Sequence, residues 1–264
     1  MSLLIGGRLV EVPGVTVIPP ASHGGPVWST LDPGDYRQRR GAPSQIVIHT
    51  TKGIWPQRVL DGAGPAGRAE HVARFWDRSD EHSAAHIVVG SDGVTACLSD
   101  VATTAAFHAT VANERSVGVE IYQEAGGGIY QAALDAAVRV VLALCEALQI
   151  PPIVVGASYD GRPLPKLLDG GPAFRCIYGH RSNTARRGRG DPGDEIFTRL
   201  QLAGAEVMPI TAYPIRNLER QQHLAALGAK LALDGIPGPA TLAAARAAGY
   251  ARWRDVPALS TSGA

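Results

Sequence analysis

The feature that most constrains the fold is a run of β-branched and apolar residues that extends from Gln45 to Thr50 and includes a single histidine, His49. A continuous apolar run of this length is typical of a strand that is covered on both faces of its sheet. We therefore predict that residues 45–50 form a buried central strand. A second apolar run, Ser116–Tyr122, predicts another strand.

Helical and strand patterns alternate after this first strand, which indicates an α/β fold. The longest helix is expected over residues 131–148, where apolar side chains recur at intervals of three and four. The pair Pro151-Pro152 ends it. The other expected elements are helices at about 67–78 and 194–202, strands at 85–89, 94–98 and 153–155, and a hairpin turn at 91–93.

The 264 residues are enough for one large domain and a small module. We expect an N-terminal arm at 1–40, which carries a short hairpin or edge strand, and a main domain at 41–203. A linker at 204–215 then leads to a small all-α module at 216–264. The long Gly/Pro-rich segment 156–175 is expected to be a functional or mobile loop.

Composition excludes several classes of protein. A formal net charge of +1 gives no electrostatic basis for binding nucleic acid. Three scattered cysteines are too few for a disulfide framework. The N-terminus lacks the basic and apolar regions of a secretory signal, and no stretch approaches 18 apolar residues. We therefore expect a monomer that is made in the cytoplasm and does not insert into membranes.

Two histidines and one aspartate lie where a metal site is expected. His49 and His180 each lie at the end of an apolar strand, and Asp191 begins the turn Asp-Pro-Gly. Two imidazoles and one carboxylate are a typical zinc shell that leaves the fourth position open for water. The residues alone leave alternatives: His49 as a buried structural histidine, and Asp191 as a turn or cap residue.

Six motifs occur in the order and spacing of the type-2 N-acetylmuramoyl-L-alanine amidases, which the chain resembles from about residue 44 to 203. These motifs are IVIHTT (46–51), SAAHIVVGSDG (83–93), FHA (107–109), NERSVGVEIYQ (113–123), YGHR (178–181) and RGRGDPGDEIF (187–197). The resemblance implies a central mixed β-sheet flanked by helices. It also implies a catalytic domain at 41–203 in which Zn²⁺ is held by His49, His180 and Asp191.

The same resemblance assigns catalytic roles to Glu120 and Arg189. Glu120 lies inside an apolar strand, where burial would raise its pKa and suit it to act as a general base. Its alternative is a solvent-facing glutamate on an edge strand. Arg189 stands where the family usually has lysine, so we expect it to stabilise an oxyanion by charge. Its alternative is a solvated loop arginine, and Arg186 and Arg187 compete for the same role.

Two further histidines fall within the matched motifs. His108 corresponds to a position in the family's substrate groove, and we expect it to donate a hydrogen bond to the peptide or the muramyl group. His86 lies in a predicted strand, and we expect a structural role for it.

The C-terminal residues resemble the small helical peptidoglycan-binding domain. The resemblance rests on the turn Asp234-Gly235-Ile236-Pro237-Gly238 followed by Pro239, between helices expected at about 218–227 and 239–248. The alternative is a helical hairpin that packs on the catalytic domain.

Together the resemblances imply an enzyme that binds bacterial peptidoglycan and hydrolyses the amide bond between N-acetylmuramic acid and L-alanine. A wall-cutting domain and a wall-binding module without an export signal favour a phage or prophage endolysin that acts on the wall after release. The alternatives are a non-catalytic peptidoglycan-recognition protein and a zinc peptidase that cuts within the stem peptide.

Overall fold

The computed structural model describes most of the chain. The described residues are 2–25, 36–51, 68–78, 84–109, 112–123, 128–155, 175–180, 191–208, 220–221, 223–231, 239–252 and 255–257. In this part of the chain, no helix is long and apolar enough to cross a membrane.

The core of the fold is an eight-stranded sheet with the strand order β12-β10-β11-β5-β9-β6-β7-β3. Its strands are β3 (Val17–Ile18), β5 (Gln45–Thr50), β6 (Ile87–Val89), β7 (Thr95–Cys97), β9 (Ser116–Ile121), β10 (Ile153–Val155), β11 (Cys176–Gly179) and β12 (Glu206–Met208). All neighbours pair in parallel except β6 and β7, which form the predicted antiparallel hairpin. The predicted mixed sheet is therefore confirmed, with β5 at its centre.

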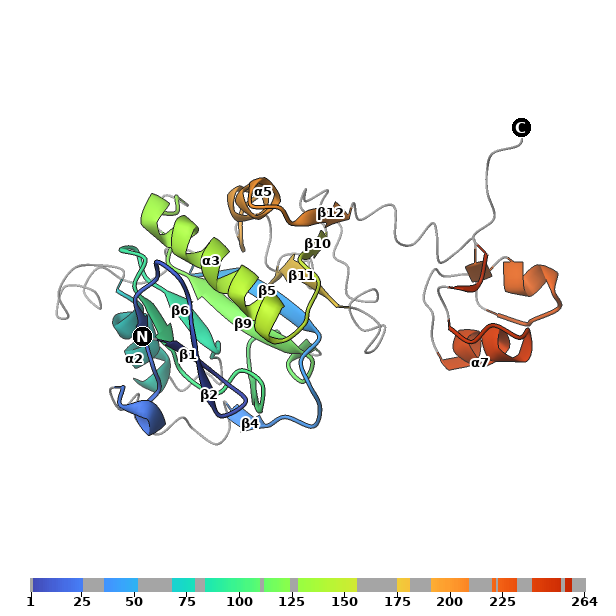
Figure 1. Ribbon diagram of the computed structural model, residues 1–264, viewed down its shortest axis with the longest axis horizontal. Coiled ribbons are helices and arrows are strands. Elements are labelled where there is room, and N and C mark those ends of the chain that lie inside the picture. The colour runs from blue at the N-terminus through green and yellow to red at the C-terminus, as the bar shows by residue number, and fades with distance from the viewer. Residues whose placement is uncertain are drawn as a thin grey trace.

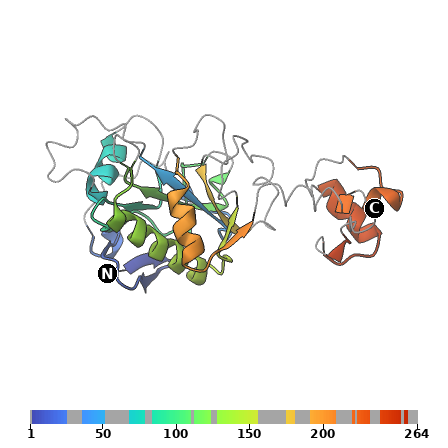
Figure 2. The same cartoon turned by 90° about the horizontal axis from the view of Figure 1, so that it is seen from above.

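Helices cover both faces of this sheet (Figures 1 and 2). They are α2 (Ala69–Arg78), α3 (Gln131–Ala147) and α5 (Glu195–Leu202). Helices α3 and α5 pack on the face formed by alternate strand residues such as Ile46, Ile48 and Val119. Helix α2 packs on the opposite face, where Val88 belongs to its apolar cluster. Because both faces are covered, the strands can be apolar throughout.

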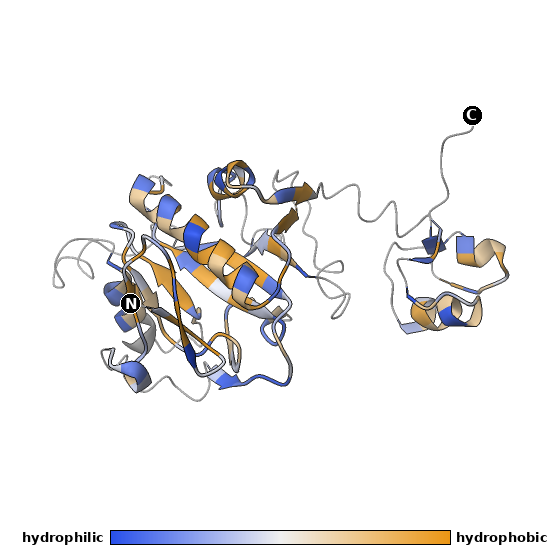
Figure 3. Ribbon diagram, viewed as in Figure 1, coloured by the Kyte–Doolittle hydropathy of each residue, from blue (hydrophilic) through white to orange (hydrophobic). Residues whose placement is uncertain are grey.

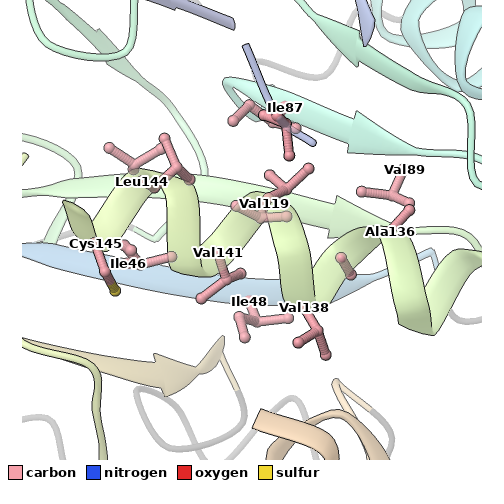
Figure 4. Packing of buried hydrophobic residues seen from close by; sticks show 14 of the residues in the cluster. Ile46, Ile48, Ile87, Val89, Val119, Ala136, Val138, Val141, Leu144 and Cys145 are labelled. Atoms are coloured by element: carbon pink, nitrogen blue, oxygen red, sulfur yellow. The ribbon is translucent and has the colours of Figure 1, made fainter. Parts of the chain in front are cut away.

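The packing of α3 explains the three-and-four spacing of its sequence. Leu134, Val138, Val141, Leu144 and Cys145 are buried along one side of the helix and join the largest apolar cluster of the protein. Figure 4 shows Val138, Val141, Leu144 and Cys145 of this helix against side chains of β5, β6 and β9. In Figure 3 the central strands of the large sheet are mostly apolar in colour, whereas α3 carries both polar and apolar segments.

The N-terminal segment is part of the main domain, which corrects its description as an arm. Strands β1 (Ser2–Ile5) and β2 (Arg8–Glu11) form the expected hairpin, and β3 is an edge strand of the large sheet. Leu3, Val12 and Val17 are buried in the same cluster as α3. A short helix, η1 (Ala21–His23), follows, and β4 (Tyr36–Gln38) pairs with β8 (Thr104–Ala106). The N-terminal segment is held in the core because the apolar residues of its short strands are buried there.

The predicted linker also begins differently from expectation. Residues 206–208 form β12, which pairs in parallel with β10 at the edge of the sheet, so the domain continues past residue 203. Its three residues are stabilised by pairing with a strand distant in sequence, which local patterns do not reveal. Residues 209–219 lie outside the described part of the chain.

The C-terminal residues contain the expected helices. Residues 220–221 and 223–226 are helical, and α7 (Pro239–Ala247) begins at the predicted proline. Leu224, Ala245 and Val256 form a small apolar cluster of their own. The motif turn at 233–238 lies outside the described residues.

Candidate metal centre and active site

Strand register places three chemically active residues in one row. In the β5–β9 pair, His49 lies opposite Glu120, and in the β11–β5 pair the residue before His180 lies opposite Ile48. His180, His49 and Glu120 therefore stand side by side near the carboxyl ends of three adjacent parallel strands, where sites in α/β proteins form. Side chains alternate along a strand, so His49 and Glu120 lie on the sheet face opposite α3, and the ring of His180, the residue after β11, lies against that of His49.

His49, His180 and Asp191 form a compact buried group, called the metal group below. One potential ligand atom of each lies within 4.8 Å of the others. The rings of His49 and His180 are 4.5 Å apart between centroids, and Nδ1 of His180 lies 3.4 Å from Oδ2 of Asp191. All three predicted ligands thus converge from separate segments of the chain.

Asp191 is held in this group by the end of β5 and by a glycine. Its Oδ1 accepts a hydrogen bond of 2.9 Å from the backbone N–H of Thr50, the residue after His49. Gly179 allows the segment of Asp191 to approach β11, because a Cβ at this position would lie 2.7 Å from Cδ of Pro192. The carboxylate therefore reaches His180 from a turn that packs directly on the strand.

The chemistry of this group fits a metal ion. His180 is buried, and its Nδ1 has no hydrogen-bond partner among the described residues although a carboxylate oxygen lies nearby. A buried polar atom without such a partner is costly, and a cation bound by the two imidazoles and the carboxylate would remove that cost. The group could therefore hold a metal ion.

Glu120 lies on a central strand, not on an edge. Strand β9 runs between β5 and β6, and Glu120 is half-buried there, opposite Val88 on one side and His49 on the other. Ser116, Gly118 and Glu120 share one face of β9 because they are spaced by two. The solvent-facing edge position considered from the sequence is therefore excluded, and the carboxylate belongs to the row of site residues.

His108 lies against this face of β9 and contacts His49. Its Nδ1 is 2.9 Å from Nε2 of His49, and its Nε2 is 3.1 Å from Oγ of Ser116. Burial, and then the neighbouring imidazoles of His86 and His180, lower the pKa of His108 well below its ordinary value. Both ring nitrogens thus have protein partners, and the expected substrate contact of His108 stays a prediction.

The fixed position of His108 depends on two other residues of the motif NERSVGVE. The side chain of Asn113 accepts hydrogen bonds from the backbone N–H groups of His108 and Ala109, at 3.0 and 2.6 Å. Gly118 makes room for the ring, because a Cβ there would lie 2.7 Å from its Cγ and Nδ1. Sequence reasoning missed Asn113 and Ser116, although the two-residue spacing of Ser116, Gly118 and Glu120 was a usable signal.

The structural role predicted for His86 is confirmed. The ring is fully buried, its Nδ1 accepts a hydrogen bond from the backbone N–H of Gly118, and its Nε2 lies 2.9 Å from the carbonyl oxygen of Thr104. Burial and the nearby guanidinium of Arg39 lower the pKa of His86 to about 3. Arg39, which the sequence analysis did not single out, is itself buried and donates to the carbonyl oxygens of Thr104 and Ser116.

The predicted oxyanion-stabilising residue, Arg189, lies outside the described residues, as do its competitors Arg186 and Arg187.

The fold and the site define the class of this protein. The sequence matches the N-acetylmuramoyl-L-alanine amidase family over residues 39–194, which is more than half of the chain. The chain belongs to this family of enzymes. The matched region includes every strand and side chain of the site described above, and it begins at residue 39, seven residues before the first matched motif.

Three solved structures are similar to this chain. PlyL is 16% identical, with 70% of this chain and 96% of that chain covered and a TM-score of 0.43. The catalytic domain of XlyA is 18% identical, with 72% and 94% covered and a TM-score of 0.44. The endolysin N-acetylmuramoyl-L-alanine amidase LysCS from Clostridium intestinale URNW is 15% identical, with 72% and 97% covered and a TM-score of 0.40. No curated protein matches the sequence.

Proposed function

We propose that this chain hydrolyses the amide bond between the lactyl group of N-acetylmuramic acid and L-alanine in bacterial peptidoglycan, with Zn²⁺ held by His49, His180 and Asp191. The observation that carries the proposal is the row formed by His180, His49 and Glu120 near the carboxyl ends of three adjacent strands. It combines a buried metal-binding group with a carboxylate on the same face. Membership of the amidase family supports the choice of substrate.

The proposed reaction uses both a bound metal ion and side chains of the protein. His49, His180 and Asp191 would hold Zn²⁺, the histidines as neutral imidazoles and the aspartate as a carboxylate that lowers the net charge of the centre. A bound Zn²⁺ would supply Lewis acidity, which would polarise the scissile carbonyl and lower the pKa of bound water to about 7. Thr50 holds one oxygen of Asp191 through its backbone N–H, which fixes the orientation of the carboxylate.

Glu120 acts as the general base in this proposal. Its carboxylate accepts a proton from the attacking water and later returns it to the amine of L-alanine as the C–N bond breaks. Its place opposite His49 in the register supports this role, because the proton then moves within one face of the sheet. Arg189 is proposed to stabilise the negative oxygen of the tetrahedral state by charge, since a guanidinium does not readily give up a proton.

The C-terminal residues are proposed to bind the cell wall. The apolar cluster of Leu224, Ala245 and Val256 and the start of α7 at Pro239 support a small helical module after the catalytic domain. A catalytic domain and a wall-binding module together favour an endolysin that acts as a monomer on the wall after release from the cytoplasm.

A digest of purified cell walls tests the proposal. Purified protein should contain zinc in a one-to-one ratio and should clear a wall suspension, and a chelator should stop clearing until zinc is restored. Mass spectrometry should find intact glycan strands and free stem peptides with an N-terminal L-alanine. Fragments cut within the stem peptide would indicate a peptidase, and binding to walls without any cleavage would indicate a recognition protein.

A further inference from the structure

A chain of hydrogen bonds runs from the metal group into the body of the domain. It begins at Nε2 of His49, which is 2.9 Å from Nδ1 of His108. It continues from Nε2 of His108 to Oγ of Ser116 at 3.1 Å, and from Oγ of Ser116 to the carbonyl oxygen of Ala112 at 2.7 Å. The four groups come from β5, from the segment after β8, from β9 and from the turn before it.

The contact between Ser116 and Ala112 fixes the direction of the other two hydrogen bonds, Ser116–His108 and His108–His49. A carbonyl oxygen only accepts, so the single hydroxyl hydrogen of Ser116 is directed to Ala112. Oγ of Ser116 must then accept from His108, which places the proton of a neutral His108 ring on Nε2. Nδ1 of His108 is therefore the acceptor, and Nε2 of His49 donates its N–H to it.

We propose that His108 is a positioning residue that, with Ser116, holds His49 in the tautomer whose Nδ1 carries the lone pair for the metal. The inference rests on the proposed metal function of His49. Metal-binding histidines commonly donate their other ring N–H to a neighbour, which fixes both the tautomer and the orientation of the ring. Here that neighbour is itself an imidazole, and its own N–H is fixed by a serine.

The surroundings of His108 leave the ring little freedom to adopt another arrangement. Asn113 holds its backbone, and the ring lies where a side chain at position 118 would be. The centroid of this ring is also 5.5 Å from the ring centroid of His86, which is fully buried.

Nitrogen NMR of the histidine rings tests this assignment. In the metal-free protein, long-range ¹H–¹⁵N spectra should show both His49 and His108 protonated at Nε2 and bare at Nδ1. After zinc is added, Nδ1 of His49 should move to a metal-bound shift, and His108 should keep its Nε2 proton. A metal-bound shift at Nε2 of His49, or at either nitrogen of His108, would overturn the proposal.

Zinc affinity of variants gives a second readout. Ser116→Ala and His108→Leu should each weaken zinc binding about 10–100-fold, the range for losing a partner of a metal-binding histidine. His108→Asn should fall between His108→Leu and wild type, because its amide oxygen replaces the Nδ1 acceptor. A purely structural role for His108 would not produce this partial rescue.

The matched control is Ser44→Ala. Ser44 is also buried and lies directly before β5, but its Oγ has no hydrogen-bond partner among the described residues. This variant should bind zinc like wild type, and thermal unfolding of all variants checks that they fold. If His108→Leu does not fold, Ser116→Ala decides; unchanged zinc affinity and an unchanged His108 tautomer in that variant would overturn the proposal.

The outcomes separate this inference from the proposed function. If the wild-type protein binds no zinc and cleaves no wall, the proposed function fails. If wild type binds zinc and cleaves walls while the Ser116 and His108 variants bind zinc equally well, the function stands and the positioning role fails.

Discussion

The two faces of the central sheet are built from the same strands and differ in what alternate residues do. On β5, Ile46 and Ile48 join the apolar cluster under α3, whereas His49 lies on the opposite face and belongs to the metal group. On β9, the core face carries Val117 and Val119, and the other face carries Ser116, Gly118 and Glu120.

The difference teaches how a buried strand can carry chemistry. The core face is stabilised by burial of apolar area, and its residues are interchangeable within limits of volume. The polar residues of the site face are each held by a specific partner, such as Asp191 by Thr50 and His108 by Ser116. We therefore expect substitutions on the core face to alter stability and substitutions on the site face to alter metal binding and catalysis.

The largest effect is expected from removing a metal ligand. His180→Ala should lose stoichiometric zinc and all wall hydrolysis, because two remaining ligands hold zinc too weakly. Its unfolding should stay cooperative, since the apolar core lies on the other face of the sheet. Metal analysis and turbidity assays measure the loss, with His23→Ala, at an exposed histidine away from the site, as the control. Retention of stoichiometric zinc by His180→Ala would show that the ligand set is wrong.

The corresponding change on the core face should act on stability alone. Leu144 on α3 is fully buried, and Leu144→Ala should lower the free energy of unfolding by about 2–5 kcal/mol. Denaturant unfolding of the zinc-free protein measures this loss. At a temperature where the variant is folded, its zinc affinity should match wild type. A large loss of affinity in the folded variant would mean that the two faces are coupled.

A smaller effect is expected at Gly118, where a side chain would meet the ring of His108. Gly118→Ala should displace the ring, because the new Cβ would lie 2.7 Å from it without movement. Zinc affinity should fall about tenfold, as for the loss of an outer partner. Isothermal titration with zinc measures the change. An affinity equal to wild type would argue against any influence of His108 on the metal group.

The smallest effect is a pH dependence on the core side of the molecule. Asp100 accepts hydrogen bonds from the backbone N–H groups of Gly6, Gly7 and Ala102, at 2.8, 2.7 and 3.0 Å. Burial raises the pKa of Asp100, but these hydrogen bonds outweigh it, and the pKa lies below its ordinary value. The ionised carboxylate therefore stabilises the fold above its unfolded pKa of ~3.9, and this contribution disappears as the pH falls through the lower folded pKa.

We expect Asp100→Ala to lower the Tm at pH 7 and the difference from wild type to shrink toward pH 2. Asp92→Ala is the control, because the exposed carboxylate of Asp92 accepts only the Val94 N–H among the contacts described for it. A Tm difference that stays constant from pH 7 to pH 2 would show that the carboxylate charge has no part in holding the hairpin.

Much of the main domain was predictable because its signals are local. The apolar run of β5 and the three-and-four spacing of α3 predict these elements wherever the rest of the chain lies. The hairpin β1–β2 was expected, but its burial was not, because the core that receives it is formed by distant residues. Strand β12 was mistaken for a linker for the same reason, since it depends on pairing with β10.

The site was predictable to the extent that its residues lie at strand ends. His49 and His180 carry that signal, whereas the partners of His108 depend on a turn at Ala112 and Asn113 that no periodic pattern marks. The resemblance of the motifs to the amidase family supplied the choice of His49, His180 and Asp191 as metal ligands. The hydrogen bonds that orient them are tertiary contacts that no local sequence pattern marks.

The most direct test of the account is the turnover of Glu120→Gln. This change preserves shape and removes the carboxylate that we propose as the base, so the variant should bind zinc one-to-one, unfold like wild type and hydrolyse walls about 10²–10⁴ times more slowly. Glu114→Gln, which changes a glutamate paired with Arg37 outside the sheet, should retain wild-type turnover. Turnover near wild type in Glu120→Gln would contradict the claim that the row of His180, His49 and Glu120 is the active site.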